Sequence, residues 1–128
     1  MIIRSDRIDP LWKLFFNHIK FDNQKSYSIA DIGSGKDPTY NRLLQYININ
    51  QFYCVEEDES FHYPNPLKVV DFNNFKKFKK NFDIINALEV IEHIHKSQIL
   101  TFFETILNKT NIAFFLQRQI LKILITNL

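Results

Sequence analysis

The chain contains only two glycines, and they lie close together at Gly33 and Gly35 in the stretch SIADIGSGK, residues 28–36. The apolar residues before them predict a strand that ends at the glycines. Asp37 and Pro38 follow, and these are residue types typical of a helix N-cap and of a first helical turn. A strand, a glycine turn and a helix N-terminus let an elongated polar ligand lie against bare backbone, beyond the carboxyl end of the strand.

A second group of residues with binding chemistry is acidic and follows a predicted strand over residues 52–56. In a doubly wound sheet, a carboxylate at the end of this strand can accept hydrogen bonds from both hydroxyls of a ribose. Glu56 directly follows the apolar part of the strand, so we expect it to have this role, with Glu57 as the second candidate. We expect Asp58 and Glu59 to be solvated, and an acidic turn that binds nothing is the alternative.

A third group follows a predicted strand over residues 82–88. His93 is the best general base in the chain, and we assign catalysis to His93 and Glu92. The alternative is that His93 only contacts a helix N-terminus. Glu89 and His93 would share a face of a helix, and with His95 nearby a divalent metal ion is a weaker alternative.

Two common nucleotide-binding motifs do not fit the glycine turn. A Walker A loop would have Ala30 at its first glycine and Asp37 in place of the hydroxyl that binds Mg²⁺. A dinucleotide fingerprint would have Pro38 at its third glycine, so an NAD-dependent oxidoreductase is a distant alternative. Pyrophosphate would also be repelled by Asp37. A ligand that carries an ammonium or sulfonium charge suits the turn better, and S-adenosylmethionine (SAM) is such a ligand.

The sequence resembles the class I SAM-dependent methyltransferases in several stretches that occur in the order typical of that family. The stretch DIGSGK is similar to the family's motif I, and the region around His93 is similar to quinone-biosynthesis O-methyltransferases. The resemblance covers residues 27–116, and it departs at Asp37, where motif I usually has a third glycine. The similar stretches are residues 31–36, 53–58, 69–72 and 82–94.

The resemblance implies methyl transfer from SAM to a small-molecule or glycan-type acceptor that the sequence does not identify, at oxygen. Small-RNA 2′-O-methyltransferases have a similar Glu-x-x-Glu-His followed by a further histidine, and since none follows His95 we assign no metal. The cofactor residues that the resemblance implies are Asp31, Gly33 and Gly35 at the turn, Glu56 and Glu57 at the ribose, Asp71 and Phe72 at the adenine, and Asn86 and Leu88 after the fourth strand.

The strands and helices that must position these residues alternate along the chain. This alternation predicts a single α/β domain with a Rossmann-like doubly wound parallel sheet, in the order 3-2-1-4-5, and helices on both faces. Two prolines make residues 61–66 irregular. The first helix is expected to bury Leu11, Leu14, Phe15, His18 and Ile19. The expected strands are residues 29–32, 52–56, 67–70, 82–88 and 112–116, and the expected helices are residues 10–21, 38–47 and a segment capped by Ser97 that buries Ile99, Leu100, Phe103, Ile106 and Leu107.

Composition adds little about function. The formal net charge is +2, which argues for neither nucleic acid nor a membrane surface. The single cysteine, Cys54, excludes an internal disulfide and fits a reducing cytoplasm. The first residues carry an acid as well as bases, so we expect no signal peptide, and no apolar run reaches the length of a membrane span. The lysines between residues 76 and 80 are expected to form a solvated face.

The C-terminus departs from the family that the sequence resembles. Family members continue with an antiparallel hairpin that builds much of the acceptor site, so we expect a truncated domain that lacks the usual hairpin. A non-catalytic SAM-binding module or pseudoenzyme is therefore the main alternative to an enzyme. Residues 119–128 are too apolar for a solvated end. We expect them to cover the edge strand over residues 112–116 as a helix or an added strand, or through a homodimer or another partner.

Overall fold

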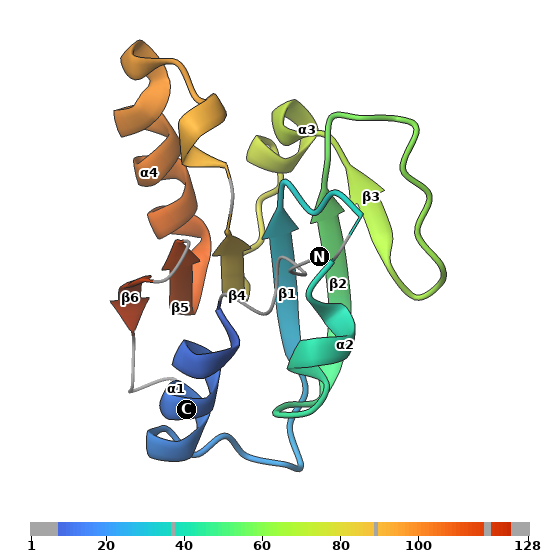
Figure 1. The fold of residues 1–128 in the computed structure, drawn as a ribbon, viewed down its shortest axis with the longest axis vertical. Helices are drawn as coiled ribbons and strands as arrows, with labels where there is room; N and C mark the ends of the chain where they lie inside the picture. The colour runs from blue at the N-terminus through green and yellow to red at the C-terminus, as the bar shows by residue number, and fades with distance from the viewer. Residues whose placement is uncertain (1–7, 37, 89, 117–118, 124–128) are drawn as a thin grey trace.

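The computed structural model describes residues 8–36, 38–88, 90–116 and 119–123 (Figure 1). Its centre is a sheet with the strand order β3-β2-β1-β4-β5-β6. The first five strands pair in parallel, which confirms the predicted order 3-2-1-4-5, and β6 pairs antiparallel with β5. The strands are β1 Tyr27–Ile32, β2 Ile49–Val55, β3 Lys68–Val70, β4 Phe82–Ala87, β5 Thr110–Leu116 and β6 Gln119–Ile123.

Helices cover both faces of the sheet, as predicted. One apolar cluster joins α1 and α2 to one face, and a second cluster joins α3 and α4 to the other. The segment between β2 and β3 is irregular, and α3 lies between β3 and β4. The helices are α1 Asp9–His18, α2 Tyr40–Leu43, α3 Phe72–Lys76 and α4 Ile99–Lys109, with 3-10 turns η2 Ile91–His93 and η3 Lys96–Gln98.

β1 lies at the centre of the sheet and is buried on both of its faces. Ile29 belongs to the cluster under α1 and α2, whereas Ala30 and Ile32 belong to the cluster under α3 and α4. At the start of the strand, Ser28 N–H donates to Asp83 Oδ2 over 2.9 Å, and Asp83 N–H donates to Ser28 Oγ over 3.1 Å. These two bonds fix the ends of β1 and β4 beside each other.

The buried stripe of α1 differs from the predicted one. Trp12 and Phe15 are buried together with Ile8, whereas Leu14 is 56% exposed and His18 is exposed. The reason is Trp12, which the prediction left out of the stripe. Its ring packs edge-on against Phe115 of β5 at a centroid distance of 6.4 Å. Because an aromatic ring of this size buries the most area, it determines which face of the helix meets the sheet.

Two helix starts were also predicted wrongly. α2 begins at Tyr40, after Pro38, because the N–H and hydroxyl of Thr39 both donate to Asp31 and hold the preceding backbone outside the helix. The predicted cap Asp37 lies outside the described residues. Ser97 does not cap α4, because the N-cap position of that helix is Gln98; the Ser97 N–H instead donates to Nδ1 of His95, the N-cap of η3.

The buried face of α4 also differs from the predicted one. Phe102 and Ile106 face the core, whereas Leu100 is 70% exposed, contrary to the prediction that it would be buried.

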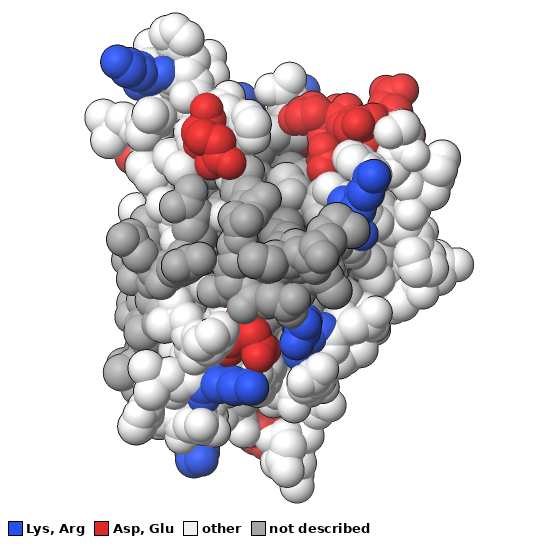
Figure 2. Space-filling view, in the orientation of Figure 1, with Lys and Arg blue, Asp and Glu red and all other residues white. Residues whose placement is uncertain are grey.

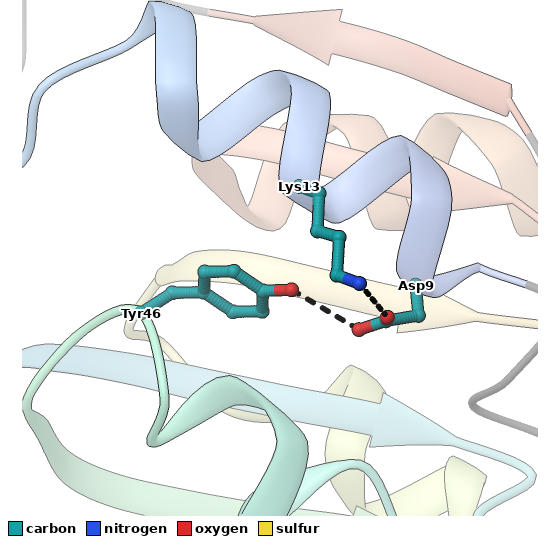
Figure 3. Close-up of polar contacts among 3 residues, drawn as sticks. All are labelled: Asp9, Lys13 and Tyr46. Carbon is teal, nitrogen blue, oxygen red and sulfur yellow. Dashed lines mark hydrogen bonds and ion pairs between the residues drawn. The ribbon is translucent and has the colours of Figure 1, made fainter.

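A polar contact joins α1 to the turn that follows α2 (Figure 3). Tyr46 O–H donates to Asp9 Oδ1 over 3.1 Å, and Asp9 Oδ2 lies 3.5 Å from Lys13 Nζ. Burial and the bond to Asp9 raise the pKa of Tyr46 to about 12. The Tyr46 ring also stacks on Phe16 with a centroid distance of 4.7 Å. Aromatic packing and one hydrogen bond therefore hold α1 against the turn that follows α2.

An added strand, β6, covers the edge of β5, as one of the expected alternatives stated. β6 pairs with β5 from Leu116 opposite Gln119 to Ala113 opposite Ile123. This confirms the added-strand alternative for residues 119–123, while residues 117–118 and 124–128 lie outside the described part. In the described residues, no helix is long and apolar enough to cross a membrane.

Candidate functional site

Both glycines of the turn adopt a left-handed backbone, for different structural reasons. Gly33 has φ +67° and Gly35 has φ +55°. A Cβ atom on Gly33 would lie 2.6 Å from Val90 Cγ2, whereas the nearest atom to a Cβ on Gly35 would be the Gly33 oxygen at 4.0 Å. Gly33 is therefore required by backbone conformation and by packing, and Gly35 by conformation alone. Space beside Gly35 remains open.

The residues after β2 hold the turn in place. Gly33 N–H donates to the Val55 carbonyl over 2.7 Å, and Gly35 N–H donates to Glu56 Oε1 over 2.7 Å. The Gly35 carbonyl accepts from Tyr63 O–H over 2.6 Å. Sequence reasoning did not find Tyr63, because no motif spacing links it to the glycines and only the fold of residues 56–67 brings it there.

Tyr63 also contacts Ser34, the residue between the two glycines. Their hydroxyl oxygens lie 3.0 Å apart, and because Tyr63 donates to Gly35, Ser34 is the donor in this pair. Burial raises the pKa of Tyr63 to about 12. The phenol therefore keeps the proton that it donates throughout the neutral range.

A buried polar network lies beneath the turn on the α1–α2 side of the sheet. Asp31, Thr39 and Asn86 are fully buried. Asp31 Oδ2 accepts from Thr39 N–H over 2.9 Å and from the Thr39 hydroxyl over 3.2 Å, and Asn86 Nδ2 donates to Thr39 Oγ1 over 3.1 Å. The parallel register puts Asp31 opposite Asn86, so the two predicted residues are neighbours. Thr39, which links them, was missed because its role depends on this register.

One atom of this network has no partner. Asn86 Oδ1 is buried and accepts no hydrogen bond from any residue that the structure describes. Buried side-chain acceptors are normally satisfied by protein, water or ligand. Asn86 therefore presents a free acceptor, next to the carboxylate of Asp31 in the sheet, to a donor group that is not part of the described chain.

A pocket of about 800 Å³ lies where the turn, the end of β2, α3 and α4 meet. This volume is within the range of small-molecule and cofactor sites. Five of the predicted site residues line it, namely Gly33, Glu56, Glu57, Phe72 and His93. The other predicted site residues do not line it: Asp31, Gly35, Asp71, Asn86, Leu88 and Glu92.

Glu56 and Glu57 form the acidic wall of the pocket. Glu56 Oε2 accepts from Asp58 N–H over 3.1 Å, in addition to the bond from Gly35, and Glu57 Oε1 accepts from Phe72 N–H over 3.0 Å. A carboxylate has about four acceptor positions, so both residues keep capacity for a ligand hydroxyl. Figure 2 shows acidic side chains gathered over the loop that follows β2, which includes Glu56 to Glu59.

Asp71 and Phe72 have different environments although they are adjacent. Asp71 caps α3: its Oδ1 accepts from Asn74 N–H over 2.7 Å and its Oδ2 accepts from Asn74 Nδ2 over 3.1 Å. Phe72 lines the pocket, and the centroid of its ring lies 5.5 Å from the ring centroid of Phe102. Phe72 therefore offers an apolar surface to a ligand, while Asp71 is engaged in capping. Leu88 is buried in the cluster under α1 and α2.

The two predicted catalytic residues lie in η2, and of the two only His93 lines the pocket. His93 Nε2 is 3.6 Å from Glu92 Oε1, and the side chains are 78% and 50% exposed, respectively. His95 also lines the pocket, but its Nδ1 lies 2.8 Å from Ser97 Oγ. Glu89 lies outside the described residues. Across the described ranges, no three His, Cys, Asp or Glu side chains are grouped to hold a metal ion.

Neither a protein-family model nor a curated protein matches the chain by sequence. Solved structures match by fold. A SAM-dependent methyltransferase from Archaeoglobus fulgidus aligns with a TM-score of 0.61 and 14% identity, over 88% of this chain and 51% of its own. Magnesium protoporphyrin IX methyltransferase from Synechocystis PCC 6803, solved with bound SAM, aligns with a TM-score of 0.58 and 13% identity, over 91% of this chain and 62% of its own.

The chain therefore spans between half and two thirds of the length of these structures. The aligned part includes the parallel sheet in the order 3-2-1-4-5 with helices on both faces. The predicted similarity to quinone-biosynthesis O-methyltransferases stays a prediction, because these alignments support the class I fold and no finer assignment. This protein has the Rossmann-like fold of SAM-dependent methyltransferases.

Proposed function

We propose that this chain binds SAM at the glycine turn and transfers its methyl group to an oxygen of a small-molecule or glycan-type acceptor. One observation carries the proposal. A single pocket is lined by a glycine of the turn, the acid that follows β2, an aromatic ring that follows β3 and a histidine that follows β4. The pocket residues thus come from segments that lie beyond the carboxyl ends of parallel strands, where α/β sheets bind their ligands.

The chemistry of the site fits SAM better than a phosphorylated ligand. Lys76 is the one cationic side chain other than histidine in the described lining, against the two carboxylates of Glu56 and Glu57. The unpaired acceptor Asn86 Oδ1 lies beside Asp31 in the sheet. An ammonium group needs acceptors of this kind, and a sulfonium cation is favoured near carboxylates. Pyrophosphate would be repelled by the same groups.

Each binding residue has a definite role in this proposal. Glu56 accepts hydrogen bonds from the ribose hydroxyls, with Glu57 beside it, and Phe72 packs against the adenine. Asn86 Oδ1 accepts from the ammonium group, while Asp31 and Leu88 support the turn from below. Asp71 keeps Phe72 at the pocket by capping α3. When bound, SAM supplies an activated methyl group whose in-line displacement requires mainly that donor and acceptor be positioned.

His93 acts as the general base that removes the proton of the acceptor hydroxyl. Its side chain lines the pocket and is exposed enough to reach an acceptor at the mouth. Glu92, 3.6 Å away, stabilises the protonated imidazole. General base catalysis of this kind typically contributes about 10²–10⁴-fold.

A non-catalytic SAM-binding module is the second candidate. One observation favours it. His93 is 78% exposed, so it is poorly shielded from water. Catalysis requires that the acceptor be held against the cofactor in a defined orientation. In this alternative the cofactor residues keep their roles, and His93 and Glu92 have none.

Calorimetry with SAM tests the cofactor assignment. Glu56→Gln keeps the shape of the side chain and removes its charge, so SAM should bind about 10-fold more weakly, as expected for a lost charge-assisted hydrogen bond. Glu59→Gln is the matched control, because Glu59 is exposed and does not line the pocket. Binding of NAD with no response to SAM would refute the assignment.

Release of S-adenosylhomocysteine separates the two candidate functions. Protein with SAM and a pool of phenolic and sugar acceptors should release it, and His93→Ala should slow release at least about 100-fold with little change in SAM affinity. His62→Ala is the control, since His62 is exposed and lies outside the pocket lining. Tight SAM binding without turnover on any acceptor would favour the non-catalytic module.

A further inference from the structure

Gly35 is held on both sides by side chains from the segment after β2. The peptide that precedes Gly35 is fixed by its N–H, which donates to Glu56 Oε1 over 2.7 Å. The peptide that follows Gly35 is fixed by its carbonyl, which accepts from Tyr63 O–H over 2.6 Å. Glycine has no Cβ and can adopt many backbone conformations, so these two contacts select one of them.

Tyr63 is itself firmly placed. Its ring packs against the apolar cluster beneath α1 and α2. The chain just after it returns to the core, because Leu67 N–H donates to the Pro64 carbonyl over 3.0 Å and Leu67 is buried. Ser34 supplies a second contact to the phenol oxygen. The packing of the ring and the path of the following chain therefore fix the position from which the Tyr63 hydroxyl reaches the turn.

We infer that Tyr63 is a positioning residue for cofactor binding, which sets the orientation of the Gly35–Lys36 peptide and through it the path of the turn at Gly33, the turn glycine that lines the pocket. The inference rests on the proposed function. Because a peptide is planar and trans, a hydrogen bond that fixes the Gly35 carbonyl also fixes the Lys36 N–H in the opposite direction. Tyr63 thus acts on the pocket through the backbone of the turn, because neither the phenol nor Gly35 lines the pocket itself.

This role differs from that of Glu56. Glu56 lines the pocket and contacts the turn, so its loss would remove a ligand contact and a turn contact together. Tyr63 hydrogen-bonds to the turn and does not line the pocket. Its loss would therefore change the turn and leave the residues that line the pocket in place. An effect of Tyr63 on SAM affinity would therefore report the conformation of Gly35.

The variant Tyr63→Phe removes the hydroxyl and keeps the ring in the core. We expect the Kd for SAM to rise about 3- to 10-fold, as for loss of one hydrogen bond that holds the binding conformation. The control is Tyr46→Phe, which removes a phenol hydroxyl of similarly raised pKa that bonds to Asp9 on α1. Tyr46→Phe should lower the melting temperature by a similar amount and change the Kd less than twofold.

A second measurement reports the turn directly. Because the chain has only two glycines, ¹⁵N-glycine labelling gives two amide resonances. Tyr63→Phe should shift the Gly35 resonance and speed its hydrogen exchange, whereas Tyr46→Phe should leave it in place. A purely structural role for Tyr63 would lower the melting temperature without these changes.

The outcomes separate the inference from the proposed function. If the natural protein binds SAM and Tyr63→Phe binds it equally well, the role of Tyr63 is refuted and the proposed function stands. If both tyrosine variants weaken binding alike, the effect is one of general stability and the inference is refuted. If the natural protein binds no SAM, the proposed function fails and the role of Tyr63 fails with it.

Discussion

A Cβ atom on Gly33 would lie 2.6 Å from Cγ2 of Val90, closer than real side chains approach each other. The glycine at the end of β1 and the valine after β4 are thus packed without space between them. A side chain at Gly33 would displace Val90 before it could obstruct a ligand. Gly35 has no such neighbour among the described residues, so it is the position where an added methyl group tests how closely a ligand approaches the turn.

Gly33→Ala should therefore destabilise the protein more than Gly35→Ala. Both substitutions put a side chain in the left-handed region, which costs about 1–2 kcal/mol. Gly33→Ala adds the overlap with Val90, for a further cost of about 1–3 kcal/mol. Urea unfolding measures both values. In the double variant Gly33→Ala with Val90→Ala, part of the extra cost should disappear, and equal losses for the two single glycine variants would contradict the packing argument.

Thr39→Val should destabilise the protein by about 1–3 kcal/mol, because it removes a hydroxyl to which Asn86 donates and which itself donates to Asp31. The shape of the side chain is nearly unchanged. Thr105→Val is the control, since the Thr105 hydroxyl bonds only to the Thr101 carbonyl of its own helix at the surface. Its cost should stay within about 0.5 kcal/mol in the same urea titration.

Stability should fall at alkaline pH. Tyr46 and Tyr63 have pKa values of about 12 in the folded protein, against 10.0 for the ordinary side chain. The native state therefore holds more protons than the unfolded state between these values, and stability decreases as pH rises from 10 toward 12. The double variant Tyr46→Phe with Tyr63→Phe should lose this dependence. Urea midpoints across that range provide the measurement, and an unchanged slope in the double variant would contradict the assignment.

Removal of residues 119–128 should lower the melting temperature or cause aggregation. β6 pairs with β5, so the deletion would leave the backbone N–H and C=O groups on one edge of β5, a strand of mostly apolar residues, without their partner strand. A truncation after Ile123 keeps the whole of β6 and is the matched control. Light scattering and thermal unfolding compare the two, and a soluble monomer of unchanged melting temperature after the longer deletion would show that β6 does not protect the edge.

The sheet order and the polar residues at its carboxyl edge could be predicted from sequence because both follow from local patterns. Buried parallel strands are apolar runs, and the residues that leave them come at fixed places in the chain. Glu56 and Phe72 were placed at the pocket on this basis. The capping role of Asp71 was also visible in principle, since an acid followed three residues later by Asn74 at a helix start is a local signal.

The missed residues act through contacts that no local pattern encodes. Thr39 links Asp31 to Asn86 only because the parallel register puts those two strands side by side. Tyr63 reaches Gly35 through an irregular segment whose path depends on packing. The face of α1 was predicted wrongly for a similar reason, because the partner of Trp12 is Phe115, far along the chain.

Two reciprocal hydrogen bonds join Ser28 to Asp83, which are 55 positions apart in the sequence. During synthesis, β1 therefore leaves the ribosome well before β4, its neighbour at the centre of the sheet. Until β4 emerges, β1 can pair with β2, but its other edge lacks a partner strand and the apolar side chains on both faces remain exposed. Long-range parallel pairing of this kind folds slowly and leaves the growing chain open to association. The nascent chain is therefore most open to association during the interval in which β4 and α4 are still being made.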